Sequence, residues 1–240
     1  MATVTHERRA AANAPAAERP EPSGVFDLLL IGLTLSAGAA DAIAFLGLDK
    51  VFSTFMTGNL VFLGFGIAGV TEPDFHRVIP ALVAFAVGVF VAVLVVKPTR
   101  GSEMWPDRVT VALGMTALVQ AVFLAGWVMT SGRPAVRAGD VLIGVCALAF
   151  GIQSGAVMSL DVKGVFTTAA TATVIMLMSA EAGWTPSDRR RLAGVVAAMV
   201  AGAAAGAFLV LHARSYAPIL PLVVTLMVIA GAVFALKPAG

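Results

Sequence analysis

The sequence predicts an all-α integral membrane protein, and three observations lead to that class. Hydrophobic residues make up 59% of the 240 residues and charged residues 12%, against about 25% charged residues in soluble domains. The mean hydropathy is +0.92. The apolar residues lie in blocks of about 20, the length of a membrane-spanning helix, and not in the alternating segments of about 10 that form a β-barrel.

A polar tail precedes the apolar blocks. Residues 1–25 are rich in Ala, Pro and charge, and they contain no apolar stretch of the kind found in a cleavable signal peptide. Because this composition is typical of disorder, we expect a disordered cytoplasmic tail followed by a membrane domain over residues 26–236.

Four blocks form the first half of that domain. The first is long enough to span a bilayer and contains Asp41. The second begins with polar residues and ends apolar. The third has Pro80 in its first turn, where proline is tolerated, and the fourth contains Gln120 near its middle. In order, these blocks are residues 26–47, 51–70, 78–96 and 109–129.

Four further blocks form the second half. The fifth carries Gln153 and Ser154, and the sixth is the shortest and has threonines in its first half. The seventh contains the pattern Gly202-Ala-Ala-Ala-Gly206, which predicts close helix packing within the bundle or a contact between two copies in a homo-oligomer. The eighth is almost wholly apolar. In order, these blocks are residues 140–160, 165–180, 192–211 and 217–236.

The two halves resemble each other. A shift of 114 residues places VFSTFMTGNLVFLG (residues 51–64) over VFTTAATATVIMLM (residues 165–178), with five of fourteen positions identical, and it also places Arg77 on Arg191. We therefore expect an internal repeat, with repeat one over residues 26–129 and repeat two over residues 140–236.

The second and sixth blocks decide the topology. The sixth has 16 residues, which as a helix would measure about 24 Å against a hydrocarbon core of about 30 Å, so both blocks can be short or re-entrant. Eight full spans would make the repeats parallel, whereas six spans and two re-entrant blocks would make them inverted. The distribution of Lys and Arg favours a cytoplasmic N-terminus under either topology.

Asp41 is the residue around which we expect a site. A carboxylate in hydrocarbon costs several kcal/mol unless it faces a bundle interior, a partner or a water-filled path. Asp41 is therefore either a proton or cation site, or a structural carboxyl that is hydrogen-bonded to Asn59 or a threonine.

Uncharged polar residues accompany this acid. Thr54 and Thr57 are three residues apart and would share a helix face, and the same spacing recurs at Thr168 and Thr171. Gln120 taken alone is more typical of helix packing. The expected substrate or ion path comprises Asp41, Thr54, Thr57, Gly58, Asn59, Gln153, Ser154, Thr168 and Thr171.

The sequence argues against an enzyme, a metal site and a cofactor. Its three histidines, His6, His76 and His212, have no metal-ligand spacing, and Cys146 is a lone cysteine inside an apolar block. No GxSxG, HExxH or Walker A run occurs. The net charge of +2 gives no reason to expect nucleic-acid binding.

At the run VFSTFMTGN, preceded by GAADA and followed in the second half by GIQSG and VFTTAAT, the chain resembles the YoaK-like family of bacterial multipass membrane proteins of unknown function. The resemblance covers roughly residues 26 to 236, and it implies a protein of the bacterial cytoplasmic (inner) membrane. It implies no substrate and no reaction.

The resulting prediction is a multipass inner-membrane transporter or channel for a small solute or ion. Asp41 would be the ionisable coupling or gating group at the repeat interface. The alternative is a non-transporting membrane scaffold or accessory subunit whose polar residues only stabilise packing. The expected partners are the lipid bilayer and the unknown solute or ion.

Overall fold

The computed structural model describes residues 24–70, 75–96, 105–160, 170–179 and 185–236. Within these ranges the chain forms eight α-helices and a short 3-10 turn, without strands, which confirms the all-α prediction. Residues 1–23 of the predicted tail, and Thr168, lie outside the described residues. The helices are α2 (Gly24–Gly47), α3 (Met56–Ile67), α4 (Phe75–Val96), α5 (Asp107–Met129), α6 (Val136–Met158), α7 (Ala170–Met178), α8 (Pro186–His212) and α9 (Ile219–Ala235).

Six of these helices are long and apolar enough to cross a membrane, and two are not. The short ones are α3, with 12 residues, and α7, with 9 residues, at the positions of the second and sixth blocks. As helices they measure about 18 Å and about 14 Å, well short of a bilayer core of about 30 Å. The structure therefore confirms that these two segments are short.

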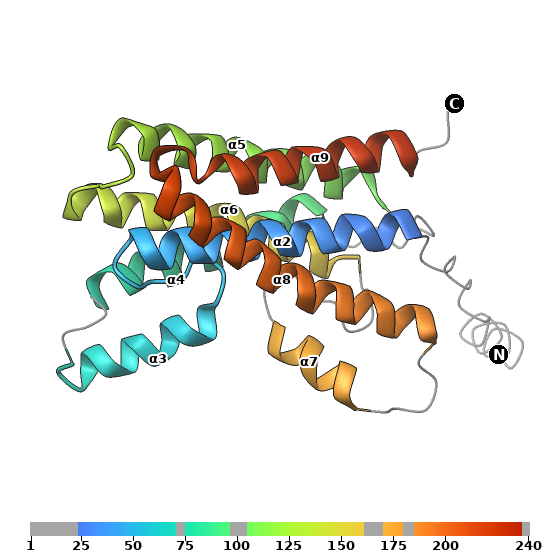
Figure 1. The fold of residues 1–240 in the computed structure, drawn as a ribbon, viewed down its shortest axis with the longest axis horizontal. Helices are drawn as coiled ribbons and strands as arrows, with labels where there is room; N and C mark the ends of the chain where they lie inside the picture. The colour runs from blue at the N-terminus through green and yellow to red at the C-terminus, as the bar shows by residue number, and fades with distance from the viewer. Residues whose placement is uncertain (1–23, 71–74, 97–104, 161–169, 180–184, 237–240) are drawn as a thin grey trace, which may run out of the picture.

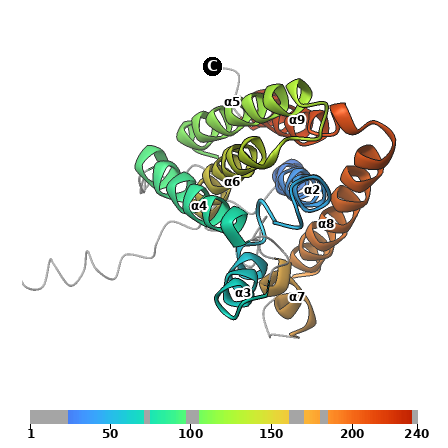
Figure 2. The same cartoon turned by 90° about the vertical axis from the view of Figure 1, so that its left-hand side faces the viewer.

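The long helices form a layered bundle. In Figures 1 and 2, α5 and α9 lie side by side on one face, α3 and α7 lie on the opposite face, and the other four helices form the middle. The most extensive helix packing joins α4 to α6 and α2 to α8. Two apolar clusters fill the interior, one around Phe26 and Leu113 and the other around Trp127 and Phe150.

Glycines bring the two main helix pairs into backbone contact. A Cβ atom added at Gly202 or Gly206 would overlap with the Leu35 or Ala39 carbonyl group of α2. In the other pair, a Cβ at Gly151 would overlap with the Phe85 carbonyl group of α4. Side chains are excluded from these crossings because the backbones touch. The Gly202-to-Gly206 pattern therefore packs within the bundle.

The chain between α2 and α3 turns back into the bundle. In Figure 1, α2 ends at the left of the molecule, the connecting segment returns toward the middle, and α3 then runs left again. Ser53 and Thr54 of this segment contact Asp41, which lies six residues, or about 9 Å, before the end of α2. The last residues of α2 and of α3 therefore lie at the same end of the bundle.

The short helix α7 lies on the same face of the bundle as α3 but runs the opposite way. Both helices begin near the middle of the long axis in Figure 1, and they diverge toward opposite ends of the molecule. The long helices at corresponding positions of the two halves are also opposed: α2 and α6 run in opposite directions, as do α4 and α8.

Candidate functional site

The Asp41 carboxylate binds the chain just before α3. Its Oδ1 atom accepts hydrogen bonds from the Ser53 amide at 2.9 Å, the Ser53 hydroxyl at 3.1 Å and the Thr54 amide at 2.7 Å. Its Oδ2 atom accepts a bond from the Thr54 hydroxyl at 2.5 Å. Asp41 is only 9% exposed. These four donors compensate the carboxylate for its lost hydration.

The side chain of Asn59 holds the same segment from the other side. Its amide oxygen accepts a bond from the Phe52 amide at 3.0 Å, and its amide nitrogen donates to the Phe52 carbonyl at 2.8 Å. Asn59 is fully buried. We call residues 51–55 the clamped segment, because Asp41 and Asn59 together bind the backbone of three consecutive residues in it.

The clamped segment is not helical, which corrects one expectation. Helix α3 begins only at Met56, so Thr54 lies in the non-helical segment before it and shares no helix face with Thr57. Thr54 is buried against Asp41, whereas Thr57 is exposed on α3. Asp41 therefore bonds to a threonine, and Asn59 bonds to backbone and not to Asp41.

Aromatic rings and a thiol surround the clamped segment. The Phe52 ring stacks on Phe45 of α2 at a centroid distance of 4.8 Å and on Phe62 of α3 at 5.9 Å. A Cβ at Gly58 would lie 2.6 Å from the Phe55 ring, so glycine leaves room for that ring. The Cys146 thiol of α6 lies within hydrogen-bonding reach of the Ser53 hydroxyl. The segment is thus packed on α2, α3 and α6.

An arginine binds the connection between α2 and α3 at Asp49, just after the end of α2. Arg77 of α4 is 3% exposed and pairs with Asp49 at 2.6 Å and with Asp140 of α6 at 2.9 Å. It also donates to the Val136 carbonyl at 3.2 Å. A Cβ at Gly139 would lie 2.8 Å from the guanidinium group, so this glycine makes space for it.

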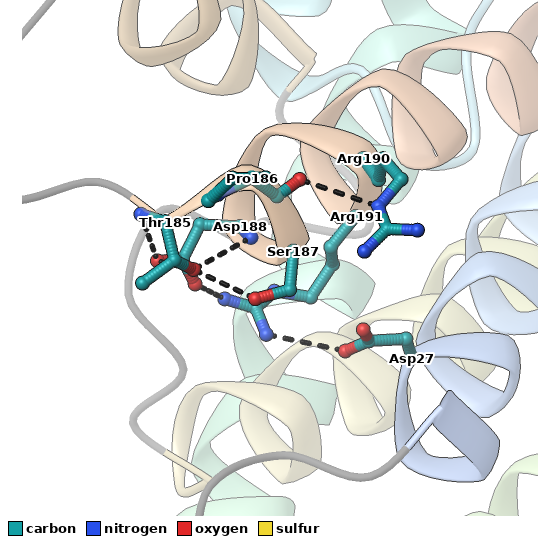
Figure 3. Close-up of polar contacts among 7 residues, drawn as sticks. All are labelled: Asp27, Thr185, Pro186, Ser187, Asp188, Arg190 and Arg191. Atoms are coloured by element: carbon teal, nitrogen blue, oxygen red, sulfur yellow. Dashed lines mark hydrogen bonds and ion pairs between the residues drawn. The ribbon is translucent and has the colours of Figure 1, made fainter.

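A second buried arginine lies at the other end of the bundle (Figure 3). Arg191 of α8 is 3% exposed, pairs with Asp27 of α2 at 3.2 Å, and also contacts Asp188. Asp188 and Thr185 form a capping box at the start of α8. The shift of 114 residues aligns Arg77 with Arg191 but does not indicate which acids pair with them. Asp27 and Asp140 are 113 residues apart, a spacing that could have revealed the second ion pair.

The other predicted path residues that the structure describes do not converge on Asp41. Gln153 is fully buried on α6 and donates to the Leu33 carbonyl at 3.1 Å, and the buried Ser154 donates to the Phe150 carbonyl at 2.7 Å. Thr171 is exposed on α7. Of the predicted residues in the described part of the chain, the structure gathers Asp41, Thr54, Gly58 and Asn59 around the clamped segment.

Thr54 is buried and Thr57 is exposed, so the same substitution at the two positions is expected to have different effects. Thr54→Val keeps the shape of the side chain but removes the hydroxyl that donates to Asp41, so we expect the free energy of unfolding to fall by about 1 kcal/mol. Thr57→Val changes an exposed side chain, so we expect a change within about 0.5 kcal/mol. Unfolding in mixed micelles measures the free energy of both variants. An equal loss of stability in the two would contradict the bond from the Thr54 hydroxyl to Asp41.

Comparisons with known proteins place the chain among membrane proteins without an assigned activity. The family model described as "Protein of unknown function (DUF1275)" matches residues 29–232. The "UPF0700 transmembrane protein YoaK" of Bacillus subtilis (strain 168) is 34% identical over 150 residues, which cover 62% of this chain and 64% of that protein. The match thus spans slightly less than two thirds of this relative. No solved structure matches the chain.

Proposed function

This chain belongs to the DUF1275 family of membrane proteins of unknown function, and from that premise we propose that it is a transporter or channel for a small solute or ion. The observation that carries the proposal is the clamped segment, a non-helical stretch of backbone bound to the buried Asp41. We further propose the bacterial inner membrane as its location, with a cytoplasmic N-terminus.

Non-helical backbone inside a membrane has a restricted set of uses. It is tolerated only where protein buries it or where it lines a water-filled cavity, because hydrocarbon cannot satisfy its amides and carbonyls. Secondary transporters place such interrupted helices at their binding sites, where exposed backbone groups and helix ends contact the solute. The clamped segment fits this pattern, since it lies inward of the end of α2 and leads directly into the short helix α3.

If the two halves are inverted repeats, this site lies where secondary transporters bind their solutes, at the repeat interface. The packing of α2 on α8 corresponds to that of α6 on α4 when the halves are exchanged. The pair of Arg77 with Asp140 corresponds in the same way to the pair of Arg191 with Asp27. Corresponding helices also run in opposite directions (Figure 1). These features support inverted repeats over residues 26–129 and 140–236, each with three crossings and one short helix.

In this proposal Asp41 is the ionisable coupling or gating group. Its carboxylate now accepts four hydrogen bonds from Ser53 and Thr54. A proton or a cation on Asp41 would compete with these donors, so binding at Asp41 and attachment of the clamped segment would be linked.

Flux in proteoliposomes tests the proposal. Wild-type protein is screened against a panel of inorganic ions, weak acids and amines, and Asp41→Asn is compared with Thr57→Val at matched insertion and folding. We expect Asp41→Asn to reduce the wild-type flux at least tenfold, because the amide cannot take up a proton or carry the charge. Thr57→Val should retain it. A folded wild-type protein that moves nothing on the panel, or an Asp41→Asn variant with full flux, would overturn the proposal.

A second candidate function is a non-transporting scaffold or accessory subunit. The observation that favours it is the close pairing of the site, in which Asp41 and Asn59 both bond to neighbouring backbone. On this account Asp41→Asn would destabilise the fold without changing any flux. The flux comparison therefore separates the two candidates.

A further inference from the structure

We propose that residues 48–55 form a gate that opens toward the membrane face on which Asp49 lies, an inference that rests on the proposed function. Three side-chain attachments on neighbouring helices hold the gate segment, as we call these residues. Arg77 binds Asp49 at its outer end, Asp41 binds Ser53 and Thr54, and Asn59 binds Phe52. On the proposed orientation of the chain, Asp49 lies at the outer face of the membrane.

The hinge of the gate is the pair Asp49 and Lys50. Their φ angles are 55° and 63°, in the left-handed region that Asp tolerates better than Lys does. The contacts on either side hold the pair in this conformation, together with the Lys50 amide, which donates to the Phe45 carbonyl at the end of α2 at 3.0 Å. Loss of those contacts would allow both residues to relax, and the relaxation would turn the gate segment away from α2.

Arg77 can release Asp49 without leaving a buried charge unpaired. Its guanidinium group has a second carboxylate partner in Asp140 and a carbonyl partner in Val136, both at the start of α6. Asp49 is 64% exposed, so water can hydrate it as soon as it leaves. Arg77 of α4 therefore stays bound to α6 when the gate opens, and Asp49 is the partner that moves away.

The gate segment covers the acid and a thiol. Ser53 contacts both the Asp41 carboxylate and the Cys146 thiol, and Cys146 is 2% exposed. Movement of the segment would uncover Asp41 from the face of the membrane where Asp49 lies. Because Cys146 is the single cysteine of the chain, its reactivity reports this movement without any engineered label.

The test measures the rate at which a charged, membrane-impermeant methanethiosulfonate modifies Cys146 in intact proteoliposomes of known protein orientation. Asp49→Asn breaks the outer attachment, and we expect modification about three to five times faster than in the wild type. Asp140→Asn is the matched control, because it removes a carboxylate from the same arginine but not from the gate segment. We expect a rate close to that of the wild type. Cys146→Ser gives the background.

Substitution of Lys50 tests the hinge independently. Lys50→Gly and Lys50→Ala both remove the side chain, but only glycine relieves the strain of a positive φ angle. The closed gate should therefore be more stable in Lys50→Gly, and Cys146 should be modified about threefold more slowly than in Lys50→Ala. Both variants lose the Lys50 ammonium group, so any effect of that loss cancels when their rates are compared.

Any of four results would overturn the gate. They are an equal rate in Asp49→Asn and the wild type, an equal rise in Asp140→Asn, modification from the opposite membrane face, and a Cys146 that resists modification in every variant. None of these rates depends on solute flux, so the gate can fail while the flux prediction holds, and the reverse.

Discussion

Asp41→Ala is expected to free the clamped segment and to lower the free energy of unfolding by about 3 kcal/mol. The substitution removes the acceptor of two amides and two hydroxyls at once. A buried donor that loses its partner costs about 1–3 kcal/mol, and the segment can recover only part of this cost by moving toward water. Unfolding in mixed micelles gives the value.

The control for this prediction is Ser154→Ala. Ser154 is also buried, but its hydroxyl donates to the Phe150 carbonyl one turn earlier in its own helix. Its removal should cost less than about 1 kcal/mol. An Asp41→Ala variant no less stable than Ser154→Ala would show that the carboxylate does not hold the segment.

Gly202→Ala is expected to disrupt the packing of α8 on α2. The new methyl group would overlap with the carbonyl group of Leu35 in the backbone of α2. Backbone cannot move aside as a flexible side chain can, so the two helices must separate, and we expect a loss of about 3 kcal/mol. A variant that fails to fold would also meet the expectation.

The same substitution at Gly114 serves as the matched control. A Cβ at Gly114 of α5 meets no atom within 4 Å, and alanine favours a helix over glycine by up to about 1 kcal/mol. Gly114→Ala should therefore be neutral or slightly stabilising in the same unfolding assay. Equal stability of the two alanine variants would contradict the backbone contact between α2 and α8.

Composition and block length predict the class but leave a choice between six and eight spans. Seven of the eight blocks have the length of a bilayer span and the sixth is visibly short, while the polar start of the second block suggested a second short segment. The pairing of Asp41 with a threonine was one of two interpretations of a buried acid. Each of these inferences rests on transfer free energies, which depend on residue type and not on tertiary contacts.

The start of α3 could not be predicted in the same way. The run VFSTF is apolar and β-branched enough to suit either a helix or an extended chain, and periodicity does not separate the two over five residues. The deciding bonds come from Asp41, which precedes it on another helix, and from Asn59, which follows it. The exposure of Thr57 is a direct consequence of the later helix start.

The two arginine clusters also depend on tertiary contacts. Arg77 and Arg191 looked like ordinary flanking charges, because the sequence does not say which helices meet at their level. The partners Asp140 and Asp27 lie 63 and 164 residues away. Only the packing of α4 on α6 and of α2 on α8 brings each pair together.

Asp41 holds the backbone of Ser53 and Thr54 inside the membrane domain. These bonds are tested by amide hydrogen exchange, compared between the wild type and Asp41→Ala in lipid nanodiscs. We expect both amides to be protected in the wild type and to exchange at least ten times faster in the variant, while the amides of α4 exchange alike in both. Fast exchange in the wild type, or unchanged protection in Asp41→Ala, would contradict the claim.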